Sequence, residues 1–226
     1  MQRVDAPEIL DSDACSPADV QISMLDLGRV NRWFGGVATT RKMVERVAQA
    51  SAMNRFSLLE VAAGSGEVAA LVKQKLARRG ITLDVTLLDR ARSHLPPGNH
   101  VVLGDALRLP FGDNAFDLVS CSLFAHHLDT QHLAQFLREA LRVCRRAVLI
   151  NDLVRHPIHL ALVYVSYPIM RSRVAWLDGV TSVRRAYVPG EIRKVVTLAF
   201  SPEEEVRMEI SRNYLFRMGV LLWKGA

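Results

Sequence analysis

Small residues follow a short apolar run at a point where they could hold a nucleotide-like ligand. Residues 58–61 form the run, and Gly64 and Gly66 bracket Ser65 directly after it. Such a run predicts a buried strand, and a glycine turn lets the backbone approach a ligand closely. Helix-forming residues follow from Glu67, so free backbone N–H groups and the positive end of a helix would face an anionic or polar ligand.

Carboxylates follow the next strands of the chain. Asp89 ends the predicted strand 82–88, about twenty residues past the glycine turn, where an acid accepts ribose hydroxyls in nucleotide-binding folds. Asp105 stands between Gly104 and Ala106, after the predicted strand 100–103. A lone strand-end acid often only caps a turn, so the joint order of these residues carries the interpretation.

A histidine pair and a further acid could move a proton. His126 and His127 follow the predicted strand 116–122, and Asp152 ends the predicted strand 146–152. Neutral imidazole removes protons near pH 7, and a carboxylate can orient it or share that role. The alternative is that each histidine is only a core or helix-terminal residue.

These residues require a sheet that brings strand ends together. Apolar runs alternate with helical patterns from residue 57 onward, and this alternation predicts a parallel sheet covered by helices on both faces. Ligands bind at the carboxyl ends of such strands. The expected helices cover residues 66–79, 90–95, 130–144 and 190–199.

Two helices are expected before the sheet. Ser16 is a typical N-cap, followed by Pro17 and Asp19, and Thr39 or Thr40 opens the second helix. These helices either cap the ligand crevice or cover a sheet edge. We expect residues 1–54 to form a helical cap on a main domain of residues 55–226, and residues 1–15 to be loosely ordered.

Composition restricts the class of protein. Lys and Arg exceed Asp and Glu by 29 to 23, so an anionic ligand, a membrane surface or nucleic acid is compatible, as is a merely basic protein. The three cysteines, Cys15, Cys121 and Cys144, show no paired spacing and predict neither disulfides nor a zinc site. No signal peptide is recognisable, and residues 158–170 are too interrupted to span a bilayer. We expect a cytoplasmic protein without stable membrane insertion.

The ordered set of motifs resembles the class I S-adenosylmethionine-dependent methyltransferases. Within them it is most similar to the small-molecule branch with the ubiquinone and menaquinone C-methyltransferases and natural-product O-methyltransferases. The matching motifs are residues 60–66 (EVAAGSG), Asp89, residues 104–106 (GDA) and residues 109–119 (LPFGDNAFDLV). The resemblance implies a Rossmann-like seven-stranded sheet, mostly parallel, whose last strands, about 203–211 and 214–224, form an antiparallel hairpin.

The resemblance also implies a site for S-adenosylmethionine, with S-adenosylhomocysteine as product. Glu60 would reach the amino group of that molecule, Asp89 the ribose, and Asp105 with Ala106 the adenine. Ala62 replaces the first glycine of the family loop, and we expect its φ to stay negative. The complete implied binding set is Glu60, Ala62, Gly64, Ser65, Gly66, Asp89, Arg90, Asp105, Ala106 and Ser122, with Arg90 stacking on the adenine.

His126, His127 and Asp152 resemble the proton-transfer group of O-methyltransferases, so we expect methyl transfer to a hydroxyl of a small apolar or aromatic, polyketide-like acceptor. Carbon transfer to a quinone-type acceptor is the alternative. Asn151-Asp152 lacks a matching acid after the fourth strand, as a catechol-type metal site requires, and no metal is expected.

The segment of about residues 154–190 would form the acceptor pocket. Its apolar residues, such as Tyr164 and Trp176, could instead be helix core or a contact in a homodimer. The arginines flanking it could bind an anionic group, although a solvated face is the plainer interpretation. They are Arg155, Arg171, Arg173, Arg184 and Arg185.

Other classes compete with this interpretation. Gly64 to Ala69 also satisfies a permissive dinucleotide fingerprint, but no room remains for the substrate domain of a nicotinamide-dependent oxidoreductase. The basic charge is compatible with RNA, but no Lys/Arg-rich tail or base-clamping tetrapeptide is present, so no nucleic-acid partner is expected. A catalytically silent binding protein is the third alternative.

Overall fold

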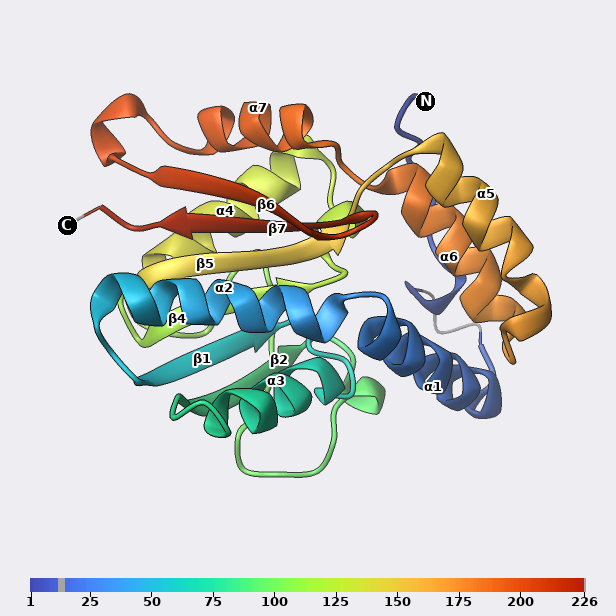
Figure 1. The fold of residues 1–226 in the computed structure, drawn as a ribbon, viewed down its shortest axis with the longest axis horizontal. Helices are drawn as coiled ribbons and strands as arrows, with labels where there is room; N and C mark the ends of the chain where they lie inside the picture. Colours follow the sequence, from blue (N-terminus) through green and yellow to red (C-terminus); the bar gives the residue numbers. More distant parts are fainter. Residues whose placement is uncertain (12–14, 226) are drawn as a thin grey trace.

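The computed structural model describes residues 1–11 and 15–225, and its centre is a seven-stranded sheet in the order β3-β2-β1-β4-β5-β7-β6 (Figure 1). The first five strands are parallel, and β6 and β7 run antiparallel at one edge. The predicted Rossmann-like fold with an antiparallel hairpin is therefore confirmed.

The strands are buried where helices cover both faces. Leu58, Leu59 and Val61 of β1 are fully buried, as the short apolar run predicts. The strands are β1 (Arg55–Val61), β2 (Thr82–Asp89), β3 (Val101–Leu103), β4 (Phe116–Ser122), β5 (Cys144–Leu153), β6 (Arg207–Tyr214) and β7 (Arg217–Trp223).

Helices on the two faces enclose separate apolar clusters. On one face, α2 (Gly36–Ser51) and α3 (Glu67–Ala77) contribute Val44, Val47 and Val72 to a cluster with β1 and β7. On the other face, α4 (Thr130–Val143) and α7 (Pro189–Ala199) pack against the sheet and against each other. The remaining helices, α1 (Pro17–Trp33), α5 (Pro157–Val165) and α6 (Arg173–Arg185), lie together beyond the carboxyl ends of the parallel strands (Figure 1).

Helix α2 packs mainly against the sheet rather than with the helices that lie beyond the strand ends. Its Val37, Met43, Val44 and Val47 pack with strand residues in one buried cluster. Helix α1 and residues 1–11 contact α6 and the turn after β4. The first turn of α2 also reaches a strand end, where Asn151 Nδ2 donates to the Gly36 carbonyl and to Thr40 Oγ1, each at 2.8 Å. The division at residue 54 stays a prediction.

Several boundaries differ from the sequence-based expectation: the expected helix 90–95 is only a 3-10 turn of Arg92–His94, and β7 begins at Arg217 rather than residue 214. Helix α2 begins at Gly36 rather than at Thr39 or Thr40, because Gly35 adopts a left-handed φ of 81° and the Thr39 N–H already bonds to its carbonyl. Strand β6 begins at Arg207 rather than residue 203, because residues 202–204 form a capped 3-10 turn. Strand β5 begins at Cys144, directly after α4.

Within the described ranges, none of the helices combines the length and the apolar character that crossing a bilayer would require.

Candidate active site

The turn after β1 uses left-handed backbone at alternate positions. Ala62, Gly64 and Gly66 have φ values of 53°, 53° and 71°. The expected negative φ at Ala62 is therefore wrong: the turn requires a left-handed residue there, and alanine adopts that conformation under strain. A Cβ added to Gly64 would meet no atom within 4 Å, whereas one on Gly66 would lie 2.5 Å from Leu87 Cδ1. Gly64 thus borders open space, and Gly66 is required for packing against β2.

Asp89 braces this turn from the end of β2. Its Oδ2 accepts a hydrogen bond from the Gly64 N–H, and its Oδ1 accepts one from the Ala91 N–H, each at 2.9 Å. The Gly104 N–H donates to the Asp89 carbonyl at 3.1 Å, which ties the loop after β3 to the same point. The loops after β1, β2 and β3 therefore converge on one residue, while the neighbouring Arg90 is exposed.

Glu60 lies at the end of β1 and is nearly inaccessible, with 3% of its surface exposed. Burial raises its pKa to about 7, although the hydroxyls of Ser120 and Ser122 favour the charged form. Ser120 Oγ donates directly to Glu60 Oε2. A carboxyl group with such a pKa would bind an amino cation readily, because the cation would restore its charge.

The predicted binding residues of the loop after β3 make few contacts of their own. Asp105 is exposed, and its Oδ1 accepts a hydrogen bond from the Leu107 N–H at 2.9 Å. Asp105 therefore caps a turn in this structure, which was the alternative interpretation from the sequence. Ser65 is also exposed, and Ala106 is half-buried. A role for these residues toward a ligand stays a prediction.

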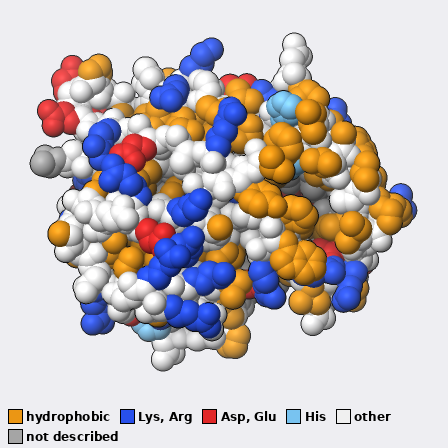
Figure 2. All heavy atoms as spheres, in the orientation of Figure 1, with side chains coloured by type: hydrophobic (Ala, Val, Ile, Leu, Met, Phe, Trp, Pro, Cys, Tyr) orange, Lys and Arg blue, Asp and Glu red, His pale blue; other side chains and the backbone are white. Residues whose placement is uncertain are grey.

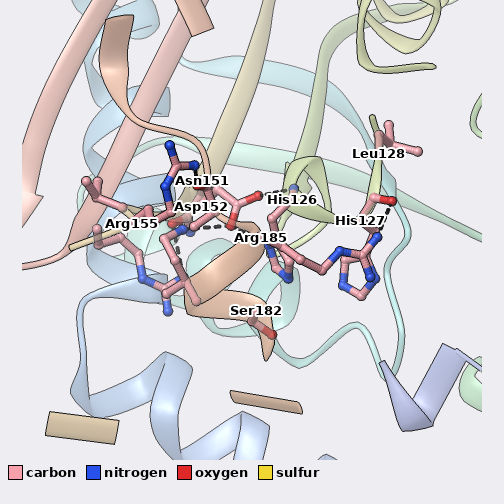
Figure 3. Close-up of polar contacts among 12 residues, drawn as sticks. His126, His127, Leu128, Asn151, Asp152, Arg155, Ser182 and Arg185 are labelled. Carbon is pink, nitrogen blue, oxygen red and sulfur yellow. Dashed lines mark hydrogen bonds and ion pairs between the residues drawn. The ribbon is translucent and has the colours of Figure 1, made fainter. Parts of the chain in front are cut away.

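His126 and Asp152 form a buried pair where β4 and β5 end (Figure 3). The His126 Nδ1 lies 2.7 Å from Asp152 Oδ1, and the His126 backbone N–H donates to Asp152 Oδ2 at 3.0 Å. The turn into this pair begins at Leu123, whose φ of 56° is unusual for a bulky residue. The structure thus brings His126 and Asp152 into contact, with the His127 ring beside that of His126, and a catalytic role for the three stays a prediction.

A second carboxylate, that of Glu8, completes the cluster, and no sequence pattern selects it. Glu8 Oε1 lies 3.3 Å from His126 Nε2, and Glu8 Oε2 lies 3.6 Å from His127 Nε2. Ser182 Oγ donates to Glu8 Oε1 at 2.7 Å. His126 and Glu8 are buried, and the side chain of His127 is 22% exposed.

The charged groups of this cluster favour one another's ionised forms. Burial lowers the pKa of His126, but the charge of Asp152, its hydrogen bond and Glu8 outweigh that effect and raise the pKa to about 10. Burial likewise opposes ionisation of Asp152 and Glu8, yet the imidazolium of His126 holds the pKa of both carboxyls below their usual values. In this arrangement His126 is a cation between two anions, and it accepts no further proton.

Residues 1–11 are fixed over this cluster by hydrogen bonds from distant elements. Arg3 donates to the carbonyls of His126, Leu128 and Arg185 at 3.1, 2.8 and 2.7 Å. Asp178 of α6 accepts from the backbone N–H groups of Ile9 and Leu10 at 2.7 and 3.0 Å. The expectation that residues 1–15 are loosely ordered is wrong for residues 1–11, and the remainder of that range lies partly outside the described residues.

Glu8, Arg3 and Asp178 are thus the site residues that sequence reasoning missed. Residues 1–11 show no periodic apolar pattern and match no motif, and their contacts are with residues far along the chain. No local signal could have selected Glu8, because its partners become neighbours only in the folded chain.

The predicted pocket segment consists of α5, a short turn and α6. Helix α5 exposes apolar side chains, with Ile158, Leu162 and Val165 at 59%, 51% and 74%. Figure 2 shows hydrophobic side chains gathered on this side of the molecule, over α1, α5 and α6. Trp176 is held beneath α5, where its Nε1 donates to the Val163 carbonyl at 2.9 Å.

The arginines that flank this segment divide into two groups. Arg155 is buried and pairs with Glu191 at 2.5 Å, and Arg185 is buried and donates to the His127 carbonyl at 2.6 Å. The expectation of a solvated face is wrong for these two, because each satisfies buried acceptors. Arg171, Arg173 and Arg184 are exposed, as that expectation requires.

Sequence comparisons identify the central part of the chain. Residues 59–150 match a family model described as a methyltransferase domain. The chain is 30% identical over 133 residues to a demethylmenaquinone methyltransferase of Thermotoga maritima, covering 58% of this chain and 51% of that protein. It is 31% identical over 150 residues to the demethylmenaquinone methyltransferase of Renibacterium salmoninarum, covering 64% of this chain and 56% of that protein. The chain thus spans about half the length of these curated relatives.

Solved structures share the fold at low identity. The plantazolicin methyltransferase BpumL, in complex with S-adenosylhomocysteine, has a TM-score of 0.68 at 11% identity and covers 93% of this chain and 96% of its own. An S-adenosylmethionine-dependent methyltransferase of Aquifex aeolicus has a TM-score of 0.59 at 15% identity, covering 93% of this chain and all of its own. Human N-acetylserotonin methyltransferase has a TM-score of 0.61 at 15% identity, covering 99% of this chain and 61% of its own. Residues 59–150 thus match a methyltransferase domain, and the sheet order and these structures show that the chain has the class I S-adenosylmethionine-dependent methyltransferase fold.

Proposed function

We propose that this chain binds S-adenosylmethionine at the ends of β1 to β3 and methylates a small apolar or aromatic acceptor. The observation that carries the proposal is the braced glycine turn, in which Asp89 holds Gly64 while Gly64 borders open space. A ligand with an amino group, a ribose and an adenine ring has a matching residue at each of the three loops.

The residues present fit this molecule. Glu60 would pair with the amino group, because a cation recovers the charge that burial disfavours. Asp89 would accept the ribose hydroxyls with the oxygen lone pairs that its two backbone bonds leave, and Asp105 with Ala106 would border the adenine. When bound, S-adenosylmethionine supplies an electrophilic methyl group, so the remaining task of the protein is to orient an acceptor and take its proton.

His126 is the proposed proton acceptor, and Asp152 keeps its ring oriented. The contact between Asp152 and Nδ1 leaves Nε2 to face the acceptor, but Glu8 covers Nε2 in this structure. The acceptor hydroxyl would therefore replace Glu8 at Nε2. Removal of Glu8 also removes one of the two acids that raise the pKa of His126, so more of the ring is neutral at neutral pH and able to accept a proton.

Two acceptor classes are supported by different observations. The buried pair of His126 and Asp152 favours transfer to a hydroxyl oxygen, which needs a base. The two curated relatives are named for methylation of demethylmenaquinone, and they favour transfer to a ring carbon. Loss of a hydroxyl proton would activate the ring of a quinol as well. After carbon methylation the proton of that ring carbon would leave and the oxygen would take a proton again, so the same base could serve either outcome. Assays with a hydroxylated aromatic and with a demethylmenaquinol as acceptor, followed by NMR of each product, would distinguish methyl transfer to oxygen from transfer to a ring carbon.

Calorimetric titration with S-adenosylhomocysteine tests the binding site, with NADH titrated in parallel. Micromolar binding that is lost in Asp89→Ala and kept in Asp84→Ala is expected, because Asp84 is an exposed acid on the same strand. Tighter binding of NADH, or equal binding by both variants, would refute the proposed site.

In a methyl-transfer assay, His126→Ala and Asp152→Asn are expected to lower kcat by about 100-fold or more.

A further inference from the structure

The cluster of Glu8, His126 and His127 has the composition and spacing of a metal centre. One ligand atom from each residue lies within 4.8 Å of the others. We propose that these three side chains bind a divalent transition metal ion, with Zn²⁺ as the best match to two imidazoles and one carboxylate. The proposal rests on these side chains alone and does not depend on the proposed methyl transfer.

The distances suit a tetrahedral ion. Metal–ligand bonds of about 2.0–2.1 Å at tetrahedral angles separate neighbouring ligand atoms by about 3.4 Å. The Glu8 oxygens lie 3.3 Å from His126 Nε2 and 3.6 Å from His127 Nε2. The rings of His126 and His127 are 4.4 Å apart between centroids, so both can face one point. Little movement would be needed to place an ion among the three.

The Nε2 atom of His126 is a second, independent sign of a ligand. His126 is 1% exposed, and its Nε2 makes no hydrogen bond within the described chain, since the approach of Glu8 at 3.3 Å has poor hydrogen-bond geometry. Buried polar atoms are rarely left in this condition. A metal ion at this position would give His126 Nε2 a partner.

The surroundings already orient the three ligands. Asp152 Oδ1 lies 2.7 Å from His126 Nδ1, and this contact keeps hydrogen on Nδ1 when a metal ion displaces the proton of Nε2. Ser182 holds Glu8 Oε1 at 2.7 Å, and Arg185 holds the His127 carbonyl at 2.6 Å. Figure 3 shows Ser182, Arg185 and Asp152 around the histidine pair. Such carboxylate–histidine–metal arrangements are common in zinc sites.

Charge and access also suit a divalent ion. Glu8 and Asp152 are both buried carboxylates, and one doubly charged ion would balance them. The 22% exposure of the His127 side chain offers a route to solvent, and three protein ligands leave a fourth position for water or an acceptor oxygen. Since Nε2 of His126 cannot bind a metal and take a proton at once, metal loading would inhibit proton transfer by His126.

The test is a metal titration of the untagged full chain, after treatment with a chelator and without cofactor or acceptor. Co²⁺ should produce the intense visible absorption of a four-coordinate site that saturates at one equivalent, and Zn²⁺ should abolish it. Glu8→Gln and His127→Gln are each expected to weaken Zn²⁺ binding by at least about 100-fold. Asp152→Asn should weaken it by about 10- to 100-fold, because it only orients a ligand.

His132→Ala is the matched control, because His132 is an exposed histidine of the next helix that pairs with Asp129. This variant should bind Co²⁺ and Zn²⁺ as the unaltered chain does. Absence of saturable binding at one equivalent would overturn the proposal. Unchanged affinity in His127→Gln would overturn it as well, because His127 is partly exposed and its substitution leaves the core intact. Neither result depends on methyl transfer, so the two proposals fail separately.

Discussion

The side-chain methyl group of Ala62 introduces backbone strain beside the candidate site. At a φ of 53° it occupies backbone conformation that costs a residue with a Cβ about 1–2 kcal/mol relative to glycine. The family pattern has glycine here, and the structure explains why. The chain therefore stores strain in the turn next to the space where the cofactor is proposed to lie.

Ala62→Gly is expected to raise the free energy of unfolding by about 1 kcal/mol, because relief of strain exceeds the added freedom of glycine in the unfolded chain. Urea denaturation would measure the change. Ala63→Gly is the control, because Ala63 has no positive φ and should lose stability instead. Equal effects of the two substitutions would argue against strain at Ala62.

Glu60 should make stability depend on pH. Its pKa is about 7 in the folded chain and 4.5 ordinarily, so between these values the unfolded chain ionises while the folded chain stays protonated. Stability should consequently fall as pH rises from 4.5 to 7, by about 3 kcal/mol in total. Denaturation curves across this range, compared with those of Glu60→Gln, would isolate its part. An identical slope in the variant would show that Glu60 is already ionised.

At the scale of elements, residues 1–11 cover His126 and so control whether an acceptor could contact it. They carry Glu8 into the cluster, and Arg3 joins them to the turn after β4 and to α6. The acceptor and Glu8 compete for the same nitrogen in the proposed reaction. The N-terminal segment would therefore have to shift for each turnover.

Asp178→Ala should loosen this segment, because it removes the acceptor of two backbone N–H groups, those of Ile9 and Leu10. Faster hydrogen exchange at these two amides is expected, with little change in β1. Asp113→Ala removes an exposed carboxylate paired with Arg142 and serves as the control. Unchanged exchange at Ile9 and Leu10 in the Asp178 variant would show that the other contacts of the segment, such as those of Arg3 and Glu8, are enough to hold it.

At the scale of the whole molecule, α2 ties the N-terminal part of the chain to the sheet. Met43 is 4% exposed, and its sulfur lies near Gly219 of β7, where an added Cβ would come within 3.1 Å of it. The antiparallel edge of the sheet thus depends on a helix that precedes the first strand. A homodimer and the lack of a nucleic-acid partner stay predictions.

Met43→Ala is expected to destabilise the whole fold by about 2–5 kcal/mol, because it leaves a cavity between α2 and the sheet. Gln49→Ala, an exposed position on the same helix, should change stability by less than about 0.5 kcal/mol. Thermal or urea unfolding monitored by circular dichroism would measure both. A similar small effect of the two would mean that α2 contributes little to the core.

Much of the fold and of the cofactor side of the site was determined by the sequence itself. Residues 58–66 contain a strand, a turn and a helix start within one short stretch, so local pattern predicts them. Asp89 and Asp152 follow from strand order, because parallel strands bring their carboxyl ends to one edge. The boundary errors at α2 and β6 arose where a glycine or a capped turn shifted the start.

Only the tertiary structure decided what surrounds His126. Its charge depends on Asp152 at the end of the neighbouring strand and on Glu8 from the N-terminal segment, and no local pattern encodes the approach of Glu8. The left-handed φ of Ala62 likewise depends on the turn that the whole loop must make. Sequence pattern reports local preference and period, whereas burial and long-range charge exist only once distant residues share a low-dielectric interior.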